Sequence, residues 1–311
     1  MNDHACCAPS GDEPPIDADP AVFPAADPGA GARAREGAVA LPGACFDMGS
    51  EDPDVNPGDS ESPIRTVHVE PFGMMPTTVT NQEFAVFVDR TGYRTTAEKL
   101  GWSYVFSGLV EGAAGPHVRG RASGTPWWLG VDGADWRHPE GAGSTIAERL
   151  DHPVVHVSHD DALAYCSWVD GRLPTETEWE YAARGGLRRA RYPWGDELTP
   201  NGEHRCNIWQ GRFPDLNTAV DGWKGTCPVN EYPPNGYGLY NMAGNVWEWS
   251  ADLWNSEESE VLYVMRGGSY ICHDSYCNRY RVSARTGNFA DSSSGHLGFR
   301  VVVDAVRSPL A

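Results

Sequence analysis

The amino-acid sequence predicts an irregular α+β fold with little regular secondary structure. Of the 311 residues, 40% are hydrophobic and 12 are tryptophan, which is enough apolar surface for a substantial core. The 35 glycines and 24 prolines follow no collagen-like period, and this content favours turns and short elements over long helices. Three short helices are still indicated, each by a hydroxyl residue followed three positions later by an acid.

Order is predicted to begin near Val39, where the sequence reads as a strand and a turn. Residues 1–36 are rich in Ala, Pro, Gly and Asp, so they bury too little apolar surface to offset the entropy lost on ordering. We therefore expect a flexible tail over residues 1–36, a single domain over residues 37–304 and a C-terminal tail over residues 305–311.

Each predicted helix begins with a residue whose side chain caps the first turn. The three pairs of capping residue and acid are Thr80 with Glu83, Ser158 with Asp161, and Thr175 with Glu178. Gly92 lies past the end of the first helix, and Gly185 is the expected C-terminal cap of the third.

Two other stretches have a distinct pattern. Residues 152–158 alternate between apolar and polar side chains, which predicts a strand. Residues 111–146 form a Gly-rich insertion that contains Trp127, Trp128 and Trp136, and we predict a surface loop there. From residue 192 onward, short apolar pieces alternate with turn residues.

The formal net charge of -19 excludes some partners. Nucleic acids and anionic membranes would be repelled, whereas a cationic peptide would be attracted. No stretch reaches the roughly 20 apolar residues that cross a bilayer. The N-terminus has neither a basic flank nor an apolar core typical of a signal peptide. We expect a cytoplasmic protein.

The eight cysteines are too sparse for a disulfide scaffold, and most are expected to be ordinary buried residues. This applies to Cys45, Cys166, Cys206 and Cys227. Cys272 and Cys277 differ, because their spacing puts them on opposite faces of a strand and far apart around a helix. Only a reversal between them brings the sulfurs together, and residues 273–275 tolerate such a turn.

Two neighbouring thiols are compatible with three structures: a disulfide, half of a four-ligand zinc site, or a site for a soft ion that accepts two ligands. Zinc requires four donors, and no second Cys or His pair has a suitable spacing. Cu(I) accepts two thiolates and leaves room for a third sulfur from a substrate. Spacing alone leaves both a structural disulfide and a metal or redox role open.

The segments between Leu41 and Arg300 carry a family resemblance. They are LPGACFDMGS, TTVTNQEFAVFV, HPVVHVSHDDALAYCSW, GRLPTETEWEYAARGG, YPWGDE, NIWQGRFPDLNTAVDGW, PPNGYGLYNMAGNVWEW, GGSYICHDSYCNRYRVSAR and DSSSGHLGFR. In this order they closely resemble the formylglycine-generating enzymes, or sulfatase-modifying factors. The superfamily also includes non-catalytic lectin-like modules and domains of iron-dependent sulfoxide synthases, and the paired-cysteine segment separates the enzymes from these relatives.

The resemblance implies a C-type-lectin-like fold and a monomeric, copper-dependent oxidase. Cys272 and Cys277 would bind Cu(I), the substrate thiolate would be the third ligand, and molecular oxygen and a thiol reductant would take part. The implied substrate is an unfolded sulfatase polypeptide with the motif Cys-x-Pro-x-Arg, whose cysteine becomes Cα-formylglycine. Ser269 and Tyr276 would orient oxygen or substrate, and Trp247 would wall the cleft. The alternative is a non-catalytic binding module of the same fold in which the cysteines form a disulfide.

The resemblance also implies two structural calcium sites built from side-chain and main-chain oxygens. Their residues are Asn207, Ile208, Asp221 and Trp223 in the first, and Asn241, Gly244, Val246 and Glu248 in the second. The alternative for Asn241 and Glu248 is that they only cap turns.

The chain departs from the family at its disulfide positions. Cys166 is retained but its partner position is Val301, and another bridge is replaced by Ala183 and Ser283, so no family disulfide is expected. His273 also stands where some relatives have a basic residue. An iron site at His152 and His156 is disfavoured, because Ser158 replaces the acid that such a site needs.

Overall fold

The computed structural model describes residues 23–110, 117–254 and 261–304, and it confirms a mixed α and β fold with few helices. The helices of this part are short: α1 (Pro28–Gly37), α2 (Asn81–Thr91), α3 (Thr96–Leu100), α4 (Ser107–Val110), α5 (His159–Trp168), α6 (Glu176–Arg184) and the 3-10 turn η2 (Pro200–Gly202). None of the described helices combines the length and the apolar character that crossing a membrane requires.

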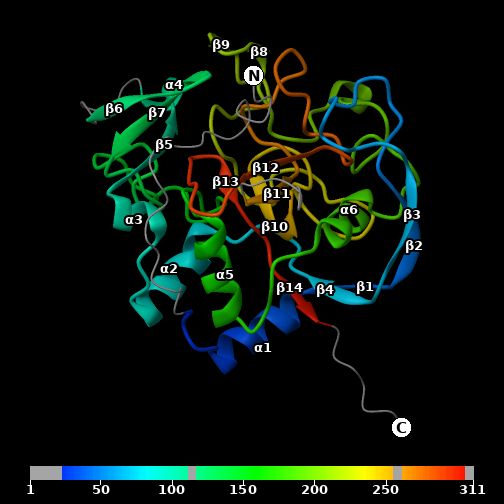
Figure 1. Cartoon of the computed structure of the whole chain (residues 1–311), viewed down its shortest axis with the longest axis horizontal. Helices are drawn as coiled ribbons and strands as arrows, with labels where there is room; N and C mark the ends of the chain where they lie inside the picture. Colours follow the sequence, from blue (N-terminus) through cyan, green and yellow to red (C-terminus); the bar gives the residue numbers. More distant parts are fainter. Residues whose placement is uncertain (1–22, 111–116, 255–260, 305–311) are drawn as a thin grey trace.

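The described strands form five small sheets. The largest has the order β12 (Arg285–Phe289), β11 (Leu262–Arg266), β10 (Trp247–Leu253) and β13 (Leu297–Gly298), with β10 antiparallel to β11 and parallel to β13. The others are β1 (Val39–Leu41), β4 (Phe72–Met74) and β14 (Val302–Asp304); β5 (Trp102–Phe106), β7 (Thr125–Asp132) and β6 (Val118–Ala122); β2 (Ala44–Met48) and β3 (Arg65–Val69); and β8 (Gly211–Arg212) and β9 (Leu216–Asn217). Figure 1 shows the largest sheet at the centre of the view, with α2 and α5 to one side and α6 to the other.

All three predicted helix starts are confirmed, each with a complete capping box. In α2, the Glu83 N–H donates to Thr80 Oγ1 at 3.2 Å, and the Thr80 N–H donates to Glu83 Oε2 at 2.8 Å. These bonds satisfy backbone groups that the first turn leaves without partners. Gly92 and Gly185 end α2 and α6 in the left-handed conformation, where glycine avoids a steric penalty.

The main core lies between α2, α5 and the largest sheet. Phe84 of α2 stacks on Tyr165 of α5 at 5.9 Å between ring centroids, and its ring meets the edge of Trp136 at 5.2 Å. Phe84 and Trp136 are fully buried, so both contribute apolar area and favourable ring geometry. The same apolar cluster includes Cys272 and Cys277, so both cysteines lie in the main core.

The predicted N-terminal tail is partly wrong. Residues 1–22 and 305–311 lie outside the described residues, but α1 occupies most of the rest of the expected tail. Asp27 caps α1 by accepting from the Ala30 N–H at 2.8 Å. A side chain at Gly31 would meet the Val169 carbonyl at 3.1 Å, so only a small residue permits this close approach to α5. The small residues that predict a flexible tail instead allow α1 to pack closely against the rest of the fold.

The prediction of a surface loop over residues 111–146 is wrong where β6 and β7 form and where Trp128 and Trp136 are buried. Residues 111–116 lie outside the described residues, and β6 and β7 follow them. Trp128 and Trp136 are fully buried, and Trp128 packs against His296 at 4.4 Å between ring centroids. Burial of these indoles places a Gly-rich segment inside the fold, where the prediction expected a surface loop.

No strand forms over residues 152–158, contrary to the prediction. His156 has a φ of 58°, a left-handed conformation that interrupts an extended chain. Its Nε2–H donates to the Pro139 carbonyl at 2.8 Å, so its Nδ1 accepts from the Ser103 hydroxyl at 2.8 Å. Both ring nitrogens are engaged, which leaves none for iron.

The buried histidines predict how stability depends on pH. Burial lowers the pKa of His156 and of His159 from 6.5 to about 4. Between these values the unfolded chain binds protons that the folded chain does not, so stability falls as the pH drops from 6.5 to about 4. Burial raises the pKa of Asp161 to about 6. This shift stabilises the folded chain as the pH falls, and it offsets about as much stability as one of the two histidines loses.

These three groups together should contribute a loss on the order of 3 kcal/mol across this range, measured by urea denaturation at successive pH values. In His159→Phe, which removes one titrating ring and keeps the stacking on Tyr263, the loss should be smaller. A stability that is constant or rises on acidification would contradict this assignment.

Candidate functional site

Cys272 and Cys277 lie on a turn between β11 and β12. The Cys272 N–H donates to the Ser269 carbonyl at 2.9 Å, and the Cys277 N–H donates to the His273 carbonyl at 2.9 Å. The Asn278 N–H also donates to His273, at 3.1 Å. The chain therefore turns between the two cysteines, as their spacing predicts.

Both thiols are reduced and buried. Neither cysteine forms a disulfide, and Cys272 and Cys277 are 1% and 3% exposed. Ser269 lies directly beside the first of them: its N–H donates to Cys272 Sγ at 3.3 Å, and its hydroxyl lies 3.9 Å from the same sulfur. These contacts hold the Cys272 sulfur against Ser269.

The donor set fits Cu(I) better than zinc. Within residues 23–110, 117–254 and 261–304, no group of three or more His, Cys, Asp and Glu side chains is arranged to hold a metal ion. Two thiols are enough for Cu(I) but supply only half of a structural zinc site. A further ligand would have to come from outside the described part of the chain, and the sulfur of a bound substrate could be that ligand.

The remaining described cysteines are of two kinds. Cys166, Cys206 and Cys227 are buried thiols, as predicted, and burial raises the pKa of each well above its ordinary value. A thiol held protonated in this way is a poor nucleophile and a poor ligand. Cys45 is exposed on β2, so the prediction that it is buried is wrong.

Aromatic rings surround the turn. Tyr276 stacks on Phe213 with centroids 4.1 Å apart and rings inclined by 9°, and its ring meets the edge of Trp127 at 4.9 Å. The Trp209 N–H donates to the Cys272 carbonyl at 3.0 Å. Tyr276 is thus held beside the cysteine turn by segments distant in sequence.

Trp247 is fully buried and belongs to the same apolar cluster as the two cysteines. It is the first residue of β10, and its N–H donates to the His296 carbonyl at 2.9 Å. In this position Trp247 supports the site from within the core. No open cleft wall at Trp247 is visible in the described part of the chain.

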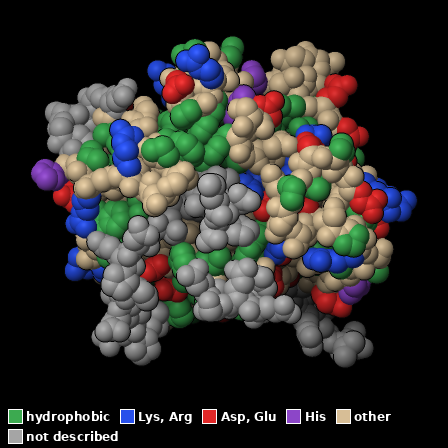
Figure 2. All heavy atoms as spheres, turned by 45° about the horizontal axis from the view of Figure 1, so that its top comes forward, with side chains coloured by type: hydrophobic (Ala, Val, Ile, Leu, Met, Phe, Trp, Pro, Cys, Tyr) green, Lys and Arg blue, Asp and Glu red, His purple; other side chains and the backbone are tan. Residues whose placement is uncertain are grey.

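A cavity of 660 Å³ opens beside Tyr270, two residues before Cys272. Its lining includes the exposed acids Glu148 and Asp151. Figure 2 shows charged side chains of both signs over most of one face of the molecule, with apolar side chains gathered towards its upper middle. The acids of the cavity would attract a cationic group.

The first predicted calcium set contains two buried oxygens with no hydrogen-bond donor. These are Asn207 Oδ1 and Asp221 Oδ2. Burial also raises the pKa of Asp221, as expected for a carboxylate without a nearby cation. Carboxylate and amide oxygens in this condition suit Ca²⁺. The main-chain carbonyl of Ile208 accepts one hydrogen bond, from Gln210 Nε2 at 3.1 Å, and the Trp223 N–H donates to Asp221 Oδ1 at 3.2 Å.

The second predicted calcium set is less well suited. Asn241 Oδ1 is buried without a donor. Glu248, however, accepts two hydrogen bonds from Arg300 and one from Trp179, each at 2.8 Å. At most one lone pair of Glu248 remains for a cation, and its charge is already balanced by Arg300. Gly244 and Val246 offer only main-chain oxygens.

One neighbour of the site has no signal in the sequence. The loop of residues 50–63, between β2 and β3, contacts residues 277–283 through hydrogen bonds and ion pairs. The two segments are more than 200 positions apart, so no local pattern predicts their contact.

The chain is similar to known proteins in sequence and in fold. The sulfatase-modifying factor enzyme 1-like domain matches residues 24–305. The formylglycine-generating enzyme of Streptomyces coelicolor is 55% identical over 301 residues, covering 92% of this chain and 96% of its own. The inactive C-alpha-formylglycine-generating enzyme 2 of Bos taurus is 48% identical, covering 87% and 89%. The structure of PvdO from Pseudomonas aeruginosa has a TM-score of 0.63 at 24% identity, covering 86% and 94%, and this likeness concerns the fold.

Proposed function

Because the chain belongs to the sulfatase-modifying factor family of formylglycine-generating enzymes, we propose that it oxidises a cysteine of sulfatase-type polypeptides to Cα-formylglycine. The proposed substrate is an unfolded polypeptide with the motif Cys-x-Pro-x-Arg. The observation that carries the proposal is the pair of buried, reduced thiols of Cys272 and Cys277 on one turn. We place the reaction in the cytoplasm, where such thiols stay reduced, and expect a monomer.

The proposed reaction balances with two co-reactants, dioxygen and a thiol reductant. The substrate CH₂–SH group, dioxygen, two electrons and two protons give an aldehyde, hydrogen sulfide and water. The C–S bond and one C–H bond of the substrate break, and a C=O bond forms. The substrate carbon is oxidised, dioxygen is reduced, and a thiol reductant supplies the two electrons.

In this proposal Cys272 and Cys277 hold Cu(I), which, when bound, supplies the dioxygen chemistry that side chains lack. The Ser269 N–H donates to Cys272 Sγ and, together with the nearby Ser269 hydroxyl, orients this sulfur. The stacked rings of Tyr276 and Phe213 exclude water from one side of the turn. The acids near Tyr270 and the net charge of -19 favour a substrate that carries arginine.

An aldehyde assay tests the activity. The chain is incubated in air with copper, a thiol reductant and a peptide containing Leu-Cys-Thr-Pro-Ser-Arg. Mass spectrometry should detect an aldehyde in place of the cysteine, and an anaerobic incubation should yield almost none. If the aerobic sample contains no aldehyde, the oxidase proposal fails.

A non-catalytic binding module is the second candidate, because a relative that is 48% identical is named as inactive. The two candidates differ in what happens to the peptide. A binding module would retain the Cys-x-Pro-x-Arg peptide unchanged, whereas the proposed enzyme releases a product of different mass.

We also propose that Ca²⁺ stabilises the fold at Asn207 and Asp221, where two buried oxygens have no donor. Calcium at 100 times its dissociation constant should add about 2.7 kcal/mol to the free energy of unfolding. Asp221→Asn should lose most of this gain, while Asp215→Asn, on the exposed β8–β9 hairpin, should keep it. Thermal unfolding with and without Ca²⁺ measures the effect, and an equal response of wild type and Asp221→Asn would contradict it.

A further inference from the structure

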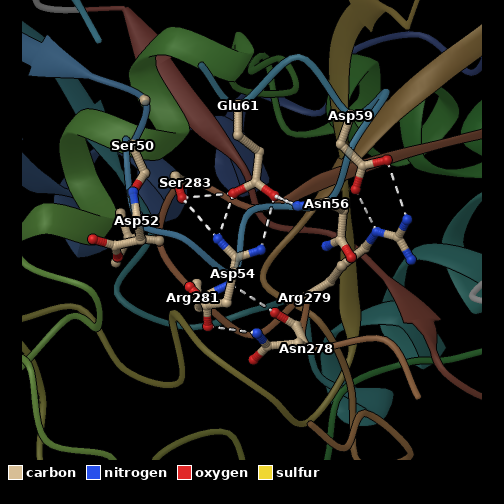
Figure 3. Close-up of polar contacts among 12 residues, drawn as sticks. Ser50, Asp52, Asp54, Asn56, Asp59, Glu61, Asn278, Arg279, Arg281 and Ser283 are labelled. Atoms are coloured by element: carbon tan, nitrogen blue, oxygen red, sulfur yellow. Dashed lines mark hydrogen bonds and ion pairs between the residues drawn. The ribbon is translucent and has the colours of Figure 1, made fainter. Parts of the chain in front are cut away.

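The loop of residues 50–63, here called the clamp loop, is joined to the segment after Cys277 by two buried ion pairs (Figure 3). Asp59 accepts from Arg279 Nε at 2.6 Å and from its Nη2 at 3.1 Å. Glu61 accepts from the two terminal nitrogens of Arg281 at 2.6 and 2.8 Å. Both contacts are bidentate, so they fix the orientation as well as the distance of each guanidinium.

These ion pairs are almost completely buried. The side chains of Asp59 and Arg279 are 2% and 5% exposed, and those of Glu61 and Arg281 are 0% and 1% exposed. Desolvation largely cancels the Coulomb energy of a buried pair, so its net contribution to stability is small. The main consequence of these pairs is that they fix the two segments relative to each other, because an alternative position of either segment would leave a buried charge without its partner.

The clamp loop also reaches the backbone of Cys277 itself. Asn56 Nδ2 donates to the Cys277 carbonyl at 3.4 Å, and the Asn56 N–H donates to Glu61 Oε1 at 3.1 Å. Asp54 accepts from Asn278 Nδ2 at 2.7 Å. The clamp loop therefore contacts the main chain of Cys277, which carries the second thiol, and the side chain of the next residue, Asn278.

The first cysteine is held from elsewhere. Trp209 donates to the Cys272 carbonyl, and Ser269 contacts the Cys272 sulfur. The two cysteines thus depend on different parts of the fold, and the turn between them contains an exposed Asp274 and Ser275. A turn of this kind does not by itself fix the separation of two sulfurs.

We propose that Asn56, Asp59 and Glu61 are positioning residues that set the Cys277 thiol relative to Cys272, so that a two-sulfur metal site exists before copper or substrate arrives. The inference rests on the proposed function for the identity of the metal. Its geometric content, a dithiol preorganised by the clamp loop, does not depend on copper.

The test compares Glu61→Gln and Asn56→Ala with Glu178→Gln. Glu61→Gln keeps the shape and removes the charge, and Asn56→Ala removes the contact to the Cys277 carbonyl. Glu178→Gln is the control, because it weakens a bidentate pair with Arg172 that links α6 to β14 and not to the cysteine turn. Thermal unfolding identifies any variant that fails to fold.

The first readout is the anaerobic Cu(I) affinity of the full chain, by competition with a chromogenic chelator. Loss of a partner outside the ligand shell typically weakens metal binding about 10 to 100-fold. We expect a loss of this size in Glu61→Gln, a smaller one in Asn56→Ala, and a change below about twofold in Glu178→Gln.

The second readout uses copper-free protein and phenylarsine oxide. The reagent exchanges its arsenic–oxygen bond for two arsenic–sulfur bonds, releasing water, so a stable adduct requires two thiols at a suitable separation. Ethanedithiol should displace it from Glu61→Gln and Asn56→Ala at about tenfold lower concentration than from wild type and Glu178→Gln. If Glu61→Gln does not fold, Asn56→Ala alone gives the answer.

Wild-type behaviour of the folded clamp variants in both readouts would overturn the inference. The wild-type chain could take up no Cu(I) while the arsenical adduct is weakened only in the clamp variants. That result would support the positioning role and refute the copper proposal. Equal weakening in Glu178→Gln would show that general loss of stability is the cause, and it too would overturn the inference.

Discussion

Cys272→Ala and Cys277→Ala should each reduce the rate of aldehyde formation by at least about three orders of magnitude, the scale seen when an essential catalytic group is removed. A single thiol cannot hold a metal that both sulfurs coordinate, so the two variants should be almost equally inactive. Steady-state assays with the Leu-Cys-Thr-Pro-Ser-Arg peptide measure the effect. Near-normal copper-dependent turnover in either variant would exclude that cysteine as a ligand.

The fold should survive both substitutions. Replacing a buried cysteine by alanine removes one sulfur atom, and small truncations of this kind cost about 1 kcal/mol. Cys166→Ala and Cys206→Ala are the matched controls, because these thiols are equally buried but lie outside the turn. They should lose similar stability and retain activity, which separates the chemistry of the sulfur from its packing.

Arg300→Met should cost about 3–5 kcal/mol of the free energy of unfolding, because it leaves the charge of Glu248 buried and unpaired. Arg300 is fully buried and also donates to the carbonyls of Met75, Pro76 and Tyr240. Its loss therefore separates the segments before α2, before β10 and before β14. Urea denaturation measures the change.

Arg172→Met is the control for this prediction. Arg172 makes a bidentate pair with Glu178, but its side chain is 38% exposed, so solvent replaces much of what is lost. A cost of about 1 kcal/mol or less is expected there. An equally small cost in Arg300→Met would mean that the buried pair does not hold these segments together.

The helices could be predicted from the sequence because their signals are local. The side chain of Ser158 and the carboxylate of Asp161 satisfy backbone groups within one turn, and no distant residue is needed to recognise that pattern. The unpredicted helix α3 begins with the same signature, Thr95 with Glu98, so its start is equally evident in the local sequence.

Elements that depend on distant partners could not be predicted in this way. Trp128 is buried against His296, and α1 is ordered because Gly31 lies close to α5. Neither partner is visible in the local sequence. The alternation of residues 152–158 resembled a strand, but its buried positions arise from an irregular segment with His156 in the left-handed region.

The candidate site also contains features with a local sequence signal and features that depend on distant segments. The need for a turn between Cys272 and Cys277 follows from their spacing. Ser269 lies beside the first sulfur, and its role in orienting oxygen or substrate stays a prediction. The contacts of Asn56 and Glu61 with residues 277–283 come from a loop whose sequence shows only acids and turn residues. Their role depends on the tertiary fold, which brings acids of one segment to arginines of another.

The central claim is that the sulfurs of Cys272 and Cys277 together bind one cuprous ion. An anaerobic titration of the reduced full chain with Cu(I), with both thiols counted beforehand, tests it most directly. We expect one tightly bound equivalent in wild type, and loss of that equivalent in Cys272→Ala and in Cys277→Ala. Failure of the fully reduced wild-type chain to bind Cu(I) tightly, or unchanged binding in either variant, would contradict the account.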